Sequence, residues 1–247
     1  MAKKRLDVLV TERGLAESRQ KAQALIMAGE VFSGDRKLDK AGMSVEDTIP
    51  LEVRGNTLRY VGRGGLKLEK AMEVFPIDLN GCTAADIGAS TGGFTDCMLQ
   101  NGAKKVYSVD VGYGELAWKL RSDERVIVLE RTNARYLSRA QVPDPLDFAS
   151  VDVSFISLKL IFPALHDLLR EGGQVVSLIK PQFEAGREFV GKKGIVRDPK
   201  VHRMVLEQYL EHAEAADFSV LDLTYSPITG QEGNIEYLGF LEKGAGR

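Results

Sequence analysis

From Cys82 onward, short apolar runs alternate with longer amphipathic runs, and this alternation constrains the fold more than any other feature. Strands are expected at 82–87, 105–110, 126–130, 147–152, 173–179, 219–224 and 236–241. Helices are expected between them, near 93–101, 115–121, 157–170 and 199–216. Strands that alternate with helices build a mostly parallel sheet with helices on both faces. The sequence therefore predicts an α/β domain with a mostly parallel, Rossmann-like sheet of seven strands.

A glycine-rich loop joins the first expected strand of this domain to its first expected helix, over residues 88–94. Glycines at such a turn let the backbone approach a ligand closely. The spacing, Asp-x-Gly-x-x-x-Gly-Gly from Asp86, is neither the dinucleotide fingerprint nor a P-loop. The next strand ends in Asp110, and an acid there can accept hydrogen bonds from two ribose hydroxyls. The loop favours S-adenosylmethionine (SAM) over NAD, with a plain capped turn as the alternative.

The length and composition of the chain limit which classes of protein it can belong to. The chain has 247 residues, 44% of them hydrophobic, which is enough for one sizeable core and a small appendage. It contains no apolar run long enough to cross a membrane, and residues 1–7 lack the apolar region of a signal peptide. Cys82 and Cys97 have no metal-ligand spacing and the three histidines form no cluster. We expect buried thiols, no metal site and a cytoplasmic location.

Residues 1–60 have a different pattern, which predicts a small α+β unit. A helix is expected from Ser18, a turn at 34–37, and strands from Val31, at 49–53 and at 58–61. Residues 1–65 carry 12 Lys/Arg against 9 Asp/Glu, whereas the remainder carries 21 against 26. This locally basic unit is compatible with RNA binding, and ordinary surface scatter is the alternative. The glycine-rich segment 61–65 is expected to link it to a second domain at 66–247.

The first unit resembles the S-four-type RNA-binding domain, or alpha-L motif. The resemblance is carried by Arg5-Leu6-Asp7, Gly14, Ser18-Arg19, Ala22, Ile26, Gly29 and Val31. In that family a basic helix face contacts phosphates, which sets affinity and position rather than sequence choice. The resemblance assigns this role to Arg5, Arg19 and Lys21, and Arg63 in the linker is added to the same set. A solvated helix face is the competing interpretation.

The two halves together resemble the TlyA family of bacterial rRNA 2′-O-methyltransferases, whose catalytic domain is like that of FtsJ. The matching strings lie at 62–68, 88–95, 110–118, 130–135, 152–157 and 180–184. The resemblance implies that the chain is an enzyme that uses SAM to methylate a cytidine ribose 2′-hydroxyl. Its partners would be ribosomal RNA or ribosomal subunits, while the target nucleotide and the oligomeric state stay open.

The resemblance also assigns residues. The catalytic set is Lys67, Asp152, Lys180 and Glu236, and the cofactor-binding set is Asp86, Gly88, Ser90, Thr91, Gly92, Gly93, Phe94, Asp110, Asn133 and Asp152. A lysine accepts a proton near neutral pH only where burial or a second ammonium favours its neutral form. We expect Lys180 at the centre, positioned by Asp152 and close to Lys67, with Glu236 orienting Lys67 or the ribose.

Several alternatives remain at this point. Lys180 and Glu236 could form a stabilising pair at the rim of the sheet, worth roughly 0–1 kcal/mol if exposed. Tyr113 and Trp118 could belong to the core or flank the cofactor. Segment 183–196 is either a mobile loop over the site or a disordered surface loop. The whole chain could also be an RNA-binding protein without catalysis, or a membrane-active haemolysin, a name attached to this family.

Overall fold

The computed structural model describes residues 3–27, 29–34, 36–53, 59–230 and 232–244. The chain divides into two compact units, Met1–Arg59 and Tyr60–Arg247. Segment 61–65, expected as a linker, belongs to the second unit. Its Val61 amide donates to the Asp96 carboxylate at 2.9 Å, and helix α3 (Gly64–Val74) begins within it. Each unit has its own hydrophobic core.

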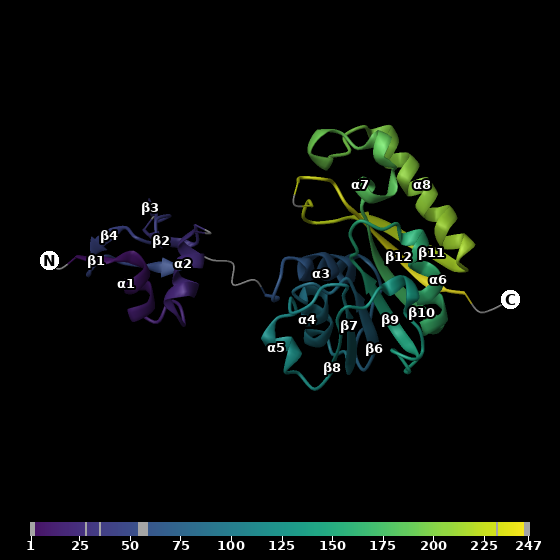
Figure 1. Cartoon of the computed structure of the whole chain (residues 1–247), viewed down its shortest axis with the longest axis horizontal. Coiled ribbons are helices and arrows are strands. Elements are labelled where there is room, and N and C mark those ends of the chain that lie inside the picture. The colour runs from purple at the N-terminus through teal and green to yellow at the C-terminus, as the bar shows by residue number, and fades with distance from the viewer. Residues whose placement is uncertain (1–2, 28, 35, 54–58, 231, 245–247) are drawn as a thin grey trace. The chain divides into compact units, whose positions relative to one another are not determined.

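The first unit is a small α+β structure, as predicted (Figure 1). Its elements are β1 (Lys3–Arg5), α1 (Leu6–Glu12), α2 (Arg19–Met27), β2 (Val31–Ser33), β3 (Arg36–Lys37), β4 (Ser44–Glu46) and β5 (Glu52–Val53). β1 pairs with β4, and β2 lies between β3 and β5, all antiparallel. The two helices bury an apolar stripe that includes Leu6, Val10, Ala22 and Ile26. This stripe forms the core because helical residues three and four apart share a face.

Some strand predictions in this unit were wrong. The strand expected at 49–53 is confined to Glu52–Val53, and strand β4 was not predicted. Arg36 and Lys37, expected in a turn, form β3, while Asp35 lies outside the described residues. Arg59–Val61 forms bends instead of a strand, and Leu58 lies outside the described residues. These elements are two or three residues long, too short for an alternating pattern to locate them.

The second unit contains the predicted seven-stranded sheet. Its strands are β6 (Thr83–Ile87), β7 (Lys105–Val109), β8 (Val126–Leu129), β9 (Leu146–Val151), β10 (Leu169–Ile179), β11 (Phe218–Tyr225) and β12 (Tyr237–Lys243). They lie in the order β11-β12-β10-β9-β6-β7-β8. β12 is antiparallel to both neighbours, and the other pairs are parallel. All five residues of β6 are buried, as expected of a central strand covered on both faces.

Helices cover both faces of this sheet (Figure 1). On one face lie α3, α4 (Gly93–Gln100) and α5 (Trp118–Arg121), and on the other α6 (Phe162–Leu168) and α8 (Pro199–Ala215). The helix expected at 157–170 is divided: a 3₁₀ turn at Leu158–Leu160 precedes α6, and β10 starts at Leu169. Segment 183–196 contains the end of α7 (Pro181–Glu184) and 3₁₀ turns at Arg187–Phe189 and Lys192–Gly194.

Tyr113 and Trp118, left open between the core and the cofactor, lie on the surface, and one of the two cysteines expected to be buried is only partly so. Trp118 is 77% exposed and Tyr113 69% exposed, so neither belongs to the core. Cys97 is buried as expected, whereas Cys82 is only partly buried. Trp118 begins α5, where it follows the buried Leu116 and precedes the buried Leu120. The core positions of this segment are therefore taken by leucines, and the indole is left on the surface.

Strand order places a crevice at the carboxyl ends of β6 and β9. From β6 the chain proceeds outward through β7 and β8, then returns to add β9 on the other side of β6. Ligands of open α/β sheets bind at such a reversal of strand order. Any ligand site is therefore expected between the loops that follow β6 and β9.

Candidate active site

A cavity of about 620 Å³ lies at this crevice. Its walls come from five places: the start of α3, the glycine loop after β6, the loop after β9, the segment around α7 and the segment before β12. The volume lies within the roughly 300–1,000 Å³ typical of small-molecule sites. All four residues of the predicted catalytic set line it, namely Lys67, Asp152, Lys180 and Glu236.

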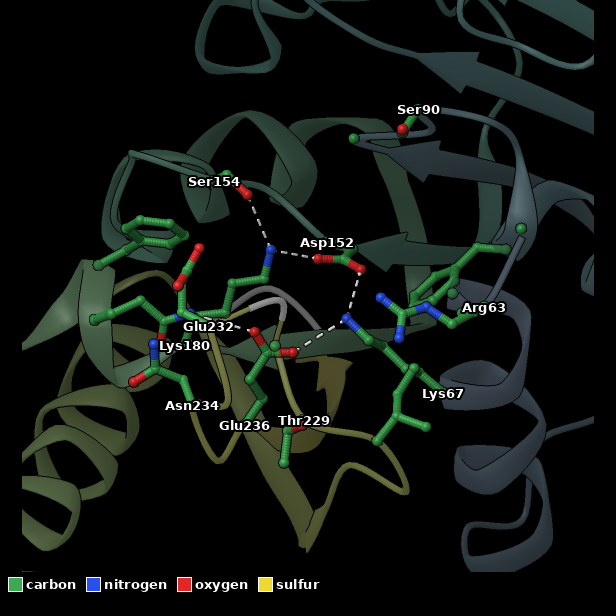
Figure 2. A pocket seen from close by; sticks show the side chains of 18 of the residues that line it. Arg63, Lys67, Ser90, Asp152, Ser154, Lys180, Thr229, Glu232, Asn234 and Glu236 are labelled. Carbon is green, nitrogen blue, oxygen red and sulfur yellow. Dashed lines mark hydrogen bonds and ion pairs between the residues drawn. The ribbon is translucent and has the colours of Figure 1, made fainter. Parts of the chain in front are cut away.

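The four side chains form one chain of ion pairs (Figure 2). Lys180 Nζ lies 2.6 Å from Asp152 Oδ1, and Lys67 Nζ lies 3.1 Å from Asp152 Oδ2. Lys67 Nζ is also 3.1 Å from Glu236 Oε2. Asp152 thus connects the two ammonium groups, and Lys67 connects the two carboxylates. The sequence left open an ion pair between Glu236 and Lys180 at the rim of the sheet. In the structure, Glu236 is instead paired with Lys67.

This cluster is buried. Lys67 and Lys180 are each 8% exposed, and Glu236 is 3% exposed. Burial acts to raise the pKa of Asp152, but the positive charges of Lys180 and Lys67 outweigh it and hold that pKa below its usual value. Asp152 therefore stays ionised between the two lysines at neutral pH. Two positive and two negative charges balance within a few ångströms, which makes this burial tolerable.

Neighbouring groups hold the ends of the cluster. Lys180 Nζ donates to Ser154 Oγ at 3.1 Å and lies 5.7 Å from the centroid of the Phe183 ring. Gln182 Nε2 donates to Glu236 Oε1 at 3.3 Å. The backbone of Gly230 passes so close to Glu236 that a Cβ at position 230 would contact the carboxylate. Each charged group is thus fixed from two or more directions.

The glycine loop after β6 forms another wall of the cavity. Five members of the proposed cofactor-binding set line the cavity here, namely Gly88, Ser90, Thr91, Gly93 and Phe94. Gly88 has φ +87°, and a Cβ there would overlap the Asp152 carbonyl. A side chain at this position would therefore separate the loop from β9. A cavity of this size, bordered by the bare backbone of Gly88 and Gly93 and by Asp152, has room for a SAM molecule.

Asp86 contributes to the loop from inside the sheet. It lines the cavity, is 1% exposed, and accepts hydrogen bonds from Thr95 N and Thr95 Oγ1 at 2.8 and 2.7 Å. Burial raises the pKa of Asp86 to about 6 and outweighs those hydrogen bonds. The carboxyl group connects the glycine loop to the start of α4, so it shapes the loop as well as bordering the cavity.

The other predicted cofactor residues lie outside this lining. Asp110 accepts from the amides of Ser90 and Gly112, both at 2.7 Å. Its two oxygens thus hold the glycine loop and the turn after β7. Gly92 has a left-handed backbone conformation, with φ +94°, and is the N-cap residue of α4. A Cβ at this position would overlap the Leu120 side chain. Asn133 is exposed, and its side chain caps the 3₁₀ turn Ala134–Tyr136 by accepting from Arg135 N.

Two of the predicted RNA-contacting residues of the first unit, Arg5 and Arg19, contact a buried acid. Asp7 is fully buried and accepts from Arg5 Nε at 3.1 Å and from Arg19 Nε at 2.9 Å. The hydrogen bond from Arg5 and the charge of Arg19 hold the pKa of Asp7 well below its usual range, although burial opposes them. Both guanidinium groups stay about half exposed. Lys21 is exposed and pairs with Glu17.

Arg63 has a different position. It is exposed, precedes α3 and lines the cavity next to Lys67 (Figure 2). Arg63 therefore shares a wall with the catalytic candidates of the second unit. The sequence grouped it with the basic residues of the first unit because only its position near the domain joint was visible.

The structure adds cavity residues that were not predicted. Phe155 is 90% exposed with φ +63°, and its ring lies 4.9 Å from that of Phe183. Asn234 is buried, accepts from Val196 N at 3.0 Å, and donates to Gly194 O at 2.8 Å. It thereby fastens the end of segment 183–196 to the loop before β12. Phe155 and Phe183 lie within the matching segments 152–157 and 180–184, so the sequence offered a signal for this aromatic pair. No motif in the sequence around Asn234 indicated its role.

Two negative findings concern the described residues alone. No group of three or more His, Cys, Asp or Glu side chains there is arranged to hold a metal ion. None of the helices in this part of the chain is both long and apolar enough to span a bilayer.

A mostly parallel seven-stranded sheet, with a glycine loop after the first strand and a cavity at its carboxyl edge, defines the Rossmann-like methyltransferases that use SAM. The FtsJ-like methyltransferase model matches residues 60–243, and the S4 domain model matches residues 4–48. The chain belongs to the FtsJ-like methyltransferase family and carries an N-terminal S4 domain. It is an enzyme, and SAM is its methyl donor.

Individual proteins agree with this assignment. YqxC of Bacillus subtilis, provisionally named an rRNA methyltransferase, is 59% identical over 96% of this chain and 84% of its own length. The 16S/23S rRNA (cytidine-2′-O)-methyltransferase TlyA of Mycobacterium tuberculosis is 42% identical over 96% of this chain and 89% of its own. A solved structure from Streptococcus thermophilus, provisionally named a hemolysin, is 52% identical, with a TM-score of 0.77 over 99% of this chain and 90% of that one.

Proposed function

We propose that this enzyme transfers a methyl group from SAM to the 2′-hydroxyl of a cytidine ribose in ribosomal RNA, acting on ribosomal subunits in the cytoplasm. The observation that carries the proposal is the buried Lys67–Asp152–Lys180–Glu236 chain beside the glycine loop. A ribose hydroxyl is a poor nucleophile, so it must be positioned and relieved of its proton. The S4 domain and the rRNA-modifying relative supply the reason for an rRNA substrate.

Lys180 and Asp152 have different roles in the proposed methyl transfer. When bound, SAM supplies a methyl group whose bond to sulfur breaks as the new bond to oxygen forms, with the electron pair remaining on sulfur. Lys180 Nζ takes the proton of the 2′-hydroxyl. Asp152 holds that nitrogen in place and neutralises the ammonium that results. Attack in line with the departing sulfur requires mainly orientation, which a rigid, buried cluster provides.

Lys180 suits the role of base better than Lys67. Lys67 is paired with two carboxylates, Asp152 and Glu236, whereas Lys180 is paired with Asp152 alone. Neutral Lys67 would disrupt two ion pairs, and neutral Lys180 only one. We therefore assign Lys67 and Glu236 to holding Asp152 and the ribose.

The S4 domain would bring the substrate to this site. Arg5 and Arg19 present half-exposed guanidinium groups that a buried carboxylate holds at fixed positions. Such groups bind phosphates strongly, and the cost of ordering them is already met by Asp7. Arg63 would contact RNA at the cavity itself, where it is exposed beside Lys67.

The decisive experiment compares Lys180→Ala with the control Lys159→Ala, which replaces an exposed lysine on the 3₁₀ turn after β9. With tritiated SAM and ribosomal subunits, Lys180→Ala should lose transfer by a factor of about 10² or more. Binding of SAM and RNA should persist in both variants. Near-normal turnover by Lys180→Ala would refute its assigned role.

The substrate is tested separately. Mapping ribose methylation in rRNA from cells with and without the gene should reveal a cytidine that loses its 2′-O-methyl group. Tight binding of rRNA with no transfer by the wild-type protein would instead favour the RNA-binding protein without catalysis.

A further inference from the structure

Ser154 lies two residues beyond Asp152, in the loop that follows β9, and its hydroxyl faces Lys180 (Figure 2). Lys180 Nζ donates to Ser154 Oγ at 3.1 Å and is paired with Asp152 Oδ1 at 2.6 Å. The ammonium therefore has two acceptors, one charged and one neutral. Both come from the same short stretch of chain, so their separation is set by the loop and not by the packing of distant elements.

The number of acceptors matters for a base. A neutral lysine amine has two N–H bonds and one lone pair, in three directions around the nitrogen. Two acceptors direct both N–H bonds, so the lone pair is left facing the third direction. A single acceptor would fix one N–H bond and leave the amine free to rotate about the Cε–Nζ bond. Lys180 lines the cavity, and we place the substrate hydroxyl in this third direction.

We propose that Ser154 is a positioning residue that aims the lone pair of neutral Lys180 at the hydroxyl to be methylated. This inference rests on the proposed function of Lys180 as the base. The 2′-hydroxyl gives its proton to Lys180 Nζ, and the oxygen uses the electron pair that it keeps to bond the methyl carbon while the bond from that carbon to the sulfur of SAM breaks. The resulting ammonium keeps its bonds to Asp152 and Ser154. Lys67 is held by two carboxylates and has no such neutral acceptor among the residues that the structure describes.

A purely structural role for Ser154 is not supported by its surroundings. Ser154 is exposed on the cavity wall, and its recorded hydrogen bond within the described residues is the one from Lys180. Truncating the side chain leaves Lys180 with its ion pair to Asp152, so no buried charge becomes unpaired. Loss of the hydroxyl should therefore affect the reaction and leave folding and ligand binding intact.

The test uses the full chain and compares Ser154→Ala with Ser154→Thr, which keeps the hydroxyl. For Ser154→Ala, kcat on ribosomal subunits should fall about 10- to 100-fold, because orientation of a general base accounts for part of its effect. KM for the subunits and Kd for SAM, measured by calorimetry, should stay within about twofold of wild type. Ser154→Thr should recover most of the lost kcat.

A control for the loop is Ser157→Ala. Ser157 lies three residues further on, and its hydroxyl donates to Glu184 Oε2 at 2.6 Å instead of contacting Lys180. This variant should keep near-normal kcat. An equal loss in Ser157→Ala would assign the effect to loop packing and overturn the inference.

Other outcomes are equally clear. Normal kcat in Ser154→Ala, or a defect confined to KM or to SAM affinity, would overturn the inference while wild-type transfer continued. Failure of the proposed function appears differently, since wild-type protein would then transfer no methyl group to rRNA even with SAM bound.

Discussion

Replacing Lys67 by Met should destabilise the protein far more than replacing an ordinary lysine. Among the described residues, Lys67 is the one side chain that bridges Asp152 and Glu236, and Glu236 is 3% exposed. Without Lys67, Glu236 keeps the hydrogen bond from Gln182 at 3.3 Å but no recorded ion pair within the described residues. Breaking a buried pair on one side costs about 3–5 kcal/mol.

The magnitude can be isolated with a double-mutant cycle. Glu236→Gln removes the stranded charge, and the double variant Lys67→Met/Glu236→Gln leaves one balanced pair, Lys180 with Asp152. The double variant should therefore be more stable than Lys67→Met alone, with a coupling energy of about 2 kcal/mol or more. Methyl transfer should be lost in both, because restoring charge balance does not restore the ammonium.

Urea unfolding followed by circular dichroism supplies the free energies, and a matched control lies on the same helix. Lys70 pairs with Glu73 at 3.6 Å on an exposed part of α3, so Lys70→Met should change stability by less than about 1 kcal/mol. If Lys67→Met cost no more than Lys70→Met, or if the cycle gave no coupling, the account of a buried, balanced cluster would be refuted.

Three further outcomes are expected. Asp7→Asn should weaken rRNA binding in filter assays, although it removes a negative charge, because Arg5 and Arg19 lose the carboxylate that holds them. It should also lower the free energy of unfolding of the first unit by about 1.5–3 kcal/mol. Tighter binding of rRNA would contradict this account. The folded-state pKa of Asp86 is raised to about 6, so the free energy of unfolding should fall by roughly 3 kcal/mol as pH rises from about 4 to 6. Asp86→Asn should remove that pH dependence in urea titrations. Gly88→Ala should abolish SAM binding in calorimetry, since its Cβ would overlap the Asp152 carbonyl. Normal affinity would contradict the role given to the glycine loop in SAM binding.

The large elements were predictable because each has its own pattern. All seven strands of the second unit lie where short apolar runs predicted them, and α4 and α8 follow amphipathic runs. The strands of the first unit, two or three residues long, were missed or displaced because so few residues carry no period. Helix 157–170 was also wrong in part, since β10 begins at Leu169 in what looked like its last turn.

For the site, the sequence by itself supplied the residue types and, through long matching strings, their grouping. Strand ends indicated that Asp152 and Lys180 would meet at one edge of the sheet, because the carboxyl ends of parallel strands share an edge. The sequence could not determine the pairing. That Lys67 bridges two carboxylates while Lys180 faces one carboxylate and Ser154 follows from distances between segments up to 169 residues apart.

The tertiary structure also decided which residues face the cavity. Asp110 and Gly92 follow the expected pattern, yet they support the loop instead of lining the space, and Trp118 is on the surface. Asn234 fastens segment 183–196 through backbone groups that no local pattern identifies. Local sequence determines which elements form, since periodicity is a short-range property. Protonation, pairing and cavity shape depend on groups distant in sequence, so only the folded arrangement determines them.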